Sequence, residues 1–127
     1  MKPHCLKILI SFLFAFAMQA NSQPLTVDSL QQIISSGTTN ENKIIAYKQL
    51  ADNQLVKNFD DCLAAAEAGY QLSEKIKDSS SLGHFMKMLG TANYFKGNYD
   101  IAATYYYKAL NILTKNSDAF QRAGVLN

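Results

Sequence analysis

Few side chains in this 127-residue sequence could carry out chemistry, and their spacing argues against a catalytic or metal-binding site. His84 is the sole histidine after residue 22, so this region has neither a two-histidine zinc site nor an H-E-x-x-H pattern. Cys62 is the sole cysteine there, and we expect it to face the core rather than act as a nucleophile. We therefore expect no enzyme activity, catalytic residue, metal ion or cofactor.

Two denser clusters could suggest chemistry, but helical geometry opposes it. Asp60 and Asp61 are adjacent on a predicted helix and so point about 100° apart. Carboxylates in a first turn stabilise the helix N-terminus, which is the simpler interpretation. The run Tyr105-Tyr106-Tyr107 cannot share one helix face, so it does not predict a stacking platform for sugars or bases. Gly90 and Gly97 lack the lysine and serine that end a phosphate loop.

Residues 1–22 predict a signal peptide. Two lysines, Lys2 and Lys7, precede an apolar run over residues 8–18. Eleven helical residues span about 16 Å, roughly half of a bilayer's hydrocarbon core, so a membrane-spanning anchor is not expected. The small residues Ala20 and Ser22 then suit a signal-peptide cleavage site before Gln23. The alternative is an N-terminal helix that stays buried or bound to a membrane. Export without a disulfide suits the periplasm of a bacterial cell envelope.

Removing the signal peptide changes the charge balance. The whole chain has a net charge of +2, but both lysines before residue 23 leave with the signal. The remainder then carries equal numbers of basic and acidic residues, and it has no basic stripe. We therefore expect no nucleic-acid partner and no membrane contact beyond the signal peptide.

The chain repeats itself at an offset of about forty residues. Residues 44–51 align with residues 83–90 at an offset of 39, and residues 58–60 align with 98–100 at an offset of 40. The spacing of apolar residues is helical throughout, without the alternation of a half-buried strand, so the fold class is all-α. Gly97 is predicted to end one helix and Asn98 to cap the next.

Five segments follow from this pattern. Residues 1–22 are the signal peptide, and residues 23–40 are a linker with a short helix over residues 28–35, ended by Gly37. Residues 41–78 and 79–116 are two repeats, the second starting at the serines of positions 79–81. Residues 117–127 begin a third repeat, with a new helix starting at Ser117 or Asp118. In the second repeat, helical spacing predicts one packing stripe formed by Tyr99, Ala102, Tyr106, Ala109, Leu110 and Leu113.

The second repeat resembles the tetratricopeptide repeat in residue types and spacing, at Leu89, Gly90, Gly97, Tyr99, Ala102, Tyr106, Ala109 and Leu110. The resemblance implies antiparallel helix pairs stacked into a short right-handed α-solenoid. It also implies that Gly90 and Ala102 are small because the helices cross there, with Tyr99 and Tyr106 filling the space beside them. The sequence departs from the family at Thr114, where proline is usual, and at Asn93, where the aromatic residue is displaced to Tyr94. The period also exceeds the usual thirty-four residues.

The resemblance implies a protein- or peptide-binding concave surface lined by the first helix of each pair. By register, the candidates are Lys48, Asp52, Leu55, His84, Lys87, Thr91 and Tyr94. An ordinary solvated helix face is the alternative for each of them.

Two functions remain open at this point. One is a non-catalytic binding scaffold of the cell envelope. The other is the sensory portion of a longer signal-transduction protein, because long repeats of this kind look similar to exported regions of bacterial sensor histidine kinases and helix-turn-helix regulators. The open end of the repeat array also predicts self-association.

Overall fold

The computed structural model describes residues 24–125, with side chains placed through Ser117, and the predicted signal peptide lies outside the described residues. Within that range the secondary structure is all-helical, which confirms the predicted class. The helices are α2 (Val27–Ser35), α3 (Asn40–Leu55), α4 (Phe59–Lys75), α5 (Ser79–Phe95) and α6 (Tyr99–Val125). The starts of α3 and α5 keep the predicted offset of 39, and those of α4 and α6 keep the offset of 40.

Polar side chains set the starts of these helices. The Thr39 hydroxyl accepts a hydrogen bond from the backbone N–H of Asn42, and Asn58 Oδ1 accepts from the N–H groups of Asp60 and Asp61. Asp78 Oδ1 accepts from the Ser81 N–H at 3.1 Å, so the cap of α5 lies one residue before the serines. Each cap supplies an acceptor to N–H groups that have no partner inside the helix.

The helix ends at Lys77 and Gly97 share one geometry. The Asn98 N–H donates to the Asn93 carbonyl at 2.9 Å, and the Asp78 N–H donates to the Ser73 carbonyl at 2.9 Å. This pattern needs a left-handed residue just before the donor. Gly97 provides it with a φ of +84°, as predicted, whereas at the other turn Lys77 adopts a φ of +59°. A lysine in this conformation carries a steric cost that glycine avoids.

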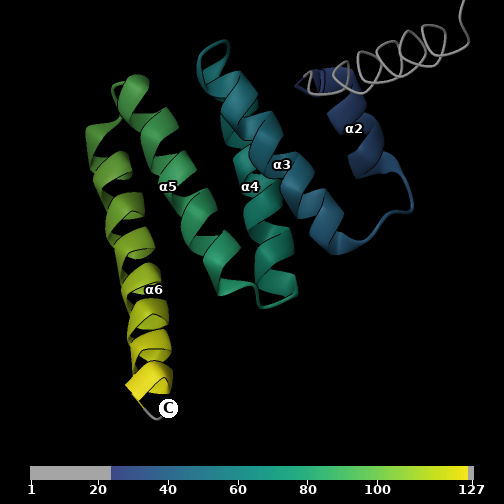
Figure 1. Cartoon of the computed structure of the whole chain (residues 1–127). Coiled ribbons are helices and arrows are strands. Elements are labelled where there is room, and N and C mark those ends of the chain that lie inside the picture. Colours follow the sequence, from purple (N-terminus) through teal and green to yellow (C-terminus); the bar gives the residue numbers. More distant parts are fainter. Residues whose placement is uncertain (1–23, 126–127) are drawn as a thin grey trace, which may run out of the picture.

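Consecutive helices pack against one another, and α3 also contacts α5. Figure 1 shows α3, α4, α5 and α6 side by side, with α2 placed against α3 at one edge. The connections at residues 56–58, 76–78 and 96–98 are three residues long, so neighbouring helices run in opposite directions. If α3 and α4 are taken as one pair and α5 and α6 as the next, the contact of α3 with α5 joins the first helices of successive pairs.

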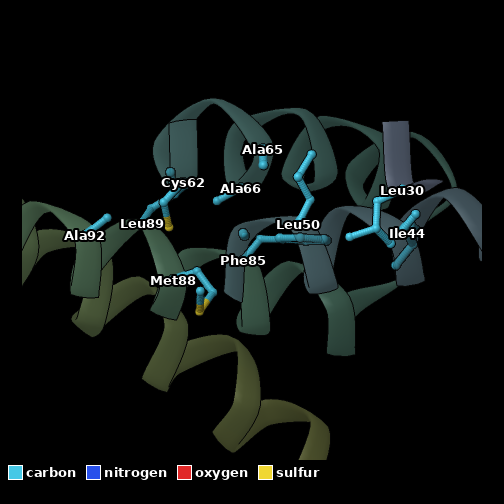
Figure 2. Packing of buried hydrophobic residues seen from close by; sticks show 12 residues of the cluster. Leu30, Ile44, Leu50, Cys62, Ala65, Ala66, Phe85, Met88, Leu89 and Ala92 are labelled. Atoms are coloured by element: carbon cyan, nitrogen blue, oxygen red, sulfur yellow. The ribbon is translucent and has the colours of Figure 1, made fainter. Parts of the chain in front are cut away.

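The buried cluster runs through α2 to α5 as one continuous band, from Leu30 and Ile44 at one end to Ala92 at the other (Figure 2). Phe85 is its largest fully buried side chain. Gly69 on α4 makes room for it, since a Cβ at that position would lie 2.2 Å from Phe85 Cζ. The predicted burial of Cys62 is confirmed, with no exposed surface.

The close crossing of α5 and α6 is confirmed at Gly90 and Ala102. A Cβ on Gly90 would lie 3.3 Å from the Ala102 carbonyl oxygen and 3.0 Å from the ring of Tyr106, while Ala102 itself is buried. Tyr106 therefore fills the space beside the crossing. The expected similar role of Tyr99 is wrong, because its side chain is 63 % exposed and contacts the ring of Tyr94 instead.

Two further expectations about α6 are wrong. Only Ala102 and Ala109 of the predicted packing stripe are buried, because they face α5 while Leu110 lies on the exposed flank. No helix begins at Ser117 or Asp118, since α6 continues unbroken to Val125. The Ser117 hydroxyl donates to the Thr114 carbonyl instead of capping a new helix, and residues 114–117 hold no glycine or proline to end α6.

Gly69→Ala should destabilise the fold even though alanine favours helix over glycine by about 1 kcal/mol, because overpacking against Phe85 costs about 1–3 kcal/mol. Phe85 is fully buried and cannot move aside without disturbing the core. Urea denaturation of Gly69→Ala, Phe85→Leu and the double variant measures this. The double variant should lose less stability than the sum of the single losses. Strict additivity would contradict the packing.

Lys77→Gly should stabilise the chain by about 0.5–1 kcal/mol, because relief of the left-handed strain exceeds the extra freedom of glycine in the unfolded chain. Lys75→Gly is the matched control, two residues earlier and inside α4, where glycine should cost about 1 kcal/mol. Thermal and urea unfolding of the two variants should therefore shift in opposite directions. A shift of the same sign would contradict the proposed strain at Lys77.

Candidate functional site

Four of the seven predicted surface residues gather where α3 packs against α5. Lys48 and Asp52 lie one turn apart on α3, and His84 and Lys87 lie one turn apart on α5. The charges of Lys48, Asp52 and Lys87 all act on the His84 imidazole, which places the four side chains in one neighbourhood. We call these four residues the α3–α5 patch.

His84 occupies the inner edge of the α3–α5 patch. Its side chain is half-buried, and its Nε2 atom is buried without a hydrogen-bond partner among the described residues. The imidazole meets the buried ring of Phe85 edge to face, with the ring centroids 5.8 Å apart. Burial, followed by the charge of Lys48, lowers the pKa of His84, and Asp52 opposes the shift. The imidazole is therefore neutral at neutral pH and has one nitrogen free to accept a hydrogen bond.

The α4–α5 turn extends this charged region through a residue that sequence reasoning did not assign to the site. Hydrogen bonds from Ser81 lower the pKa of Asp78, and the charge of Lys48 lowers it further. Asp78 is thus both the cap of α5 and a carboxylate close to the α3–α5 patch. The sequence prediction placed the helix start at the three serines rather than at Asp78, and the proximity of Asp78 to Lys48 depends on the packing of α3 against α5.

A shallow groove adjoins the patch at Asp52. It has a volume of about 360 Å³ and is lined by Pro24, Leu25, Gln49, Asp52 and Asn53. Leu25 contributes an exposed apolar side chain, while Gln49 and Asn53 contribute amides that donate and accept hydrogen bonds. An extended chain lying in the groove could therefore reach the α3–α5 patch through Asp52.

The other three predicted residues lie outside this group. Leu55 is partly buried and packs against the core. The Thr91 hydroxyl donates to the Lys87 carbonyl and accepts from the Tyr106 hydroxyl at 3.0 Å, which ties it to α6. Tyr94 is half exposed, and its ring meets those of Phe95 and Tyr99. Tyr94 alone of these three presents much of its surface to solvent.

The described residues offer little for covalent or metal chemistry. Burial, followed by the charge of Asp52, raises the pKa of the Cys62 thiol to about 11, so the reactive thiolate is scarce at neutral pH. No group of three or more histidine, cysteine, aspartate or glutamate side chains comes together as a metal site in this part of the chain. Over the same described residues, no helix has the length and apolar character needed to cross a membrane.

Comparison with known proteins identifies no relative. No family model matches the chain, and neither a curated protein nor a solved structure is significantly similar to it. The interpretation of function therefore depends on the residues of this chain.

The depressed pKa of His84 predicts a loss of stability in mild acid. Its folded pKa lies below the ordinary value of 6.5, so between those two values the unfolded chain binds a proton that the folded chain does not. The contribution of neutral His84 to the free energy of unfolding is therefore fully present above the unfolded pKa. It falls as the pH drops through 6.5 toward the folded pKa. His84→Gln should flatten the dependence of unfolding free energy on pH between about 7.5 and 5.

Urea denaturation across that range measures the effect. Asp78→Asn is the control, because the folded pKa of Asp78 is lowered below 3.8 and its contribution is lost only in stronger acid. The slope near pH 6 should therefore persist in Asp78→Asn. Equal slopes in the parent chain and in His84→Gln would contradict the assignment.

Proposed function

We propose that this chain is an exported, non-catalytic scaffold of the tetratricopeptide-repeat kind that binds a segment of another protein. The observation that carries the proposal is the α3–α5 patch, in which the first helices of two successive pairs bring charges of both signs around one half-buried imidazole. The bound segment would lie across α3 and α5 and continue into the groove beside Asp52.

The repeated helix geometry supports the proposed solenoid arrangement. Asn58 and Asn98 stand at equivalent positions before α4 and α6, at the offset found in the sequence. Small residues occur where helices approach closely, at Gly69 between α4 and α5 and at Gly90 between α5 and α6. Contact between α3 and α5 is what stacking of successive helix pairs requires.

The charges of the patch favour a peptide that carries both an acidic group and hydrogen-bond donors. Lys48 and Lys87 offer ammonium donors, whereas Asp52 offers a carboxylate acceptor. Charges of both signs around one imidazole suit a protein segment better than a uniformly negative nucleic acid.

Charge reversal at Lys48 and Lys87 should weaken binding. Peptides would be selected from a display library on the parent chain, and their affinities would be measured by fluorescence anisotropy. The Lys48→Glu/Lys87→Glu double variant should bind the selected peptides at least about tenfold more weakly, since like charges at an interface cost several kcal/mol. Increasing salt should also weaken binding to the parent chain.

A double variant with the same change in charge provides the control. Lys57 and Lys115 are both exposed and lie outside the α3–α5 patch. Lys57→Glu/Lys115→Glu should therefore bind the selected peptides like the parent chain, and circular dichroism should show equal helicity in all three proteins. Peptides that bind both double variants equally, or a library that yields no binder, would refute the proposed site.

A further inference from the structure

A pocket between α2 and α3 adjoins the groove beside Asp52. It has a volume of about 240 Å³. Its lining consists of Leu25, Leu30, Ile33, Ser36, Thr38, Asn42, Ile45, Ala46 and Gln49. Leu25 and Gln49 also line the groove beside Asp52, so the pocket and the groove share two walls. We call this space the α2–α3 pocket.

The walls of the α2–α3 pocket suit an uncharged, apolar side chain. None of its lining residues carries a charge, and more than half of them are apolar. Leu30 is fully buried, whereas Leu25 is 45 % exposed and Ile45 is 53 % exposed. An apolar side chain that entered the pocket would remove the exposed surfaces of Leu25 and Ile45 from water, which is favourable. A charged side chain would instead lose its hydration without gaining a partner of opposite charge.

The polar residues of the pocket are largely engaged within the chain itself. The Ser36 hydroxyl donates to the Ile33 carbonyl at 2.7 Å, and the Asn42 side-chain amide donates to the Thr38 hydroxyl at 3.0 Å. These bonds reduce the demand for a polar ligand. Gln49 stands at the wall shared with the groove, where its amide can both donate to and accept from the backbone of an extended chain.

The α2–α3 pocket and the α3–α5 patch occupy one face of α3. The residues of that face are Ile45, Lys48, Gln49 and Asp52, at helical spacings of three, one and three residues. At the repeat offset of 39, Ile45 corresponds to His84 on α5. Ile45 and Asp52 are about 10 Å apart along the helix axis, a distance that about three residues of an extended chain cover. One bound segment can therefore reach both the pocket and the patch.

We infer that the α2–α3 pocket takes one apolar side chain of the segment that the α3–α5 patch binds. The inference rests on the proposed function and specifies the partner further, as a segment with a leucine, isoleucine or phenylalanine within about three residues of its acidic group. An apolar cavity of about 150 Å³ is large enough for benzene, so the α2–α3 pocket has room for one such side chain. Leu25 and α2 lie outside the two repeats, so this specificity comes from residues 23–40 together with α3.

Affinity measurements on paired variants test the pocket. Peptides selected on the parent chain should carry an apolar residue within about three residues of an acidic one. Changing that residue to alanine should weaken binding to the parent chain about tenfold or more, the loss expected for one buried apolar side chain. Ile45→Gln should weaken binding of the selected peptide several-fold. It should not weaken binding of the alanine peptide further, because both changes remove the same contact.

Ile101→Gln is the matched control. Ile101 is 50 % exposed on α6 and is not among the residues that line the α2–α3 pocket. This uncharged substitution should leave the affinity for both peptides like that of the parent chain. Equal losses in Ile45→Gln and Ile101→Gln would overturn the inference, and so would additive effects of Ile45→Gln and the alanine change in the peptide.

The outcomes separate the pocket from the proposed function. Selected peptides that bind Lys48→Glu/Lys87→Glu weakly but show no preference for an apolar residue would refute the pocket alone. Peptides that bind this double variant like the parent chain, or a library without binders, would refute both the patch and the pocket. Sedimentation equilibrium tests the other occupant. A parent chain that dimerises, with a dimer that Ile45→Gln disrupts, would assign the pocket to a second copy and overturn the inference.

Discussion

The fold depends on the close approach of neighbouring helices at glycines, each of which accepts a large side chain from the next helix. Gly69 on α4 receives Phe85 of α5, while Gly90 and Gly83 on α5 receive Tyr106 and Leu113 of α6. Half of the buried cluster consists of alanine and cysteine, whose short side chains could not fill wider gaps between helices. Each glycine–large residue contact therefore fixes both the spacing of two helices and their register along the axis.

This packing also determines where the α3–α5 patch lies. His84 precedes Phe85 on α5, and adjacent helical residues point about 100° apart. Because Phe85 is held in the core by Gly69, the His84 ring is turned toward the boundary between α5 and α3, where Lys48 and Asp52 act on it. The half-burial of the imidazole follows from its contact with the Phe85 ring at that boundary. A loss of core packing would therefore alter the charge environment of the patch as well as stability.

The sequence was informative wherever a local rule decides the structure. The repeat offset, the left-handed Gly97, the burial of Cys62 and the crossing at Gly90 all follow from residue size or conformational freedom. It was misleading where tertiary packing decides. Leu110 has the spacing of a core residue, but it lies on a flank of α6 that α5 does not cover and is 62 % exposed. Lys77 adopts a glycine-like conformation that no local pattern predicts, because the packing of α4 against α5 imposes the turn.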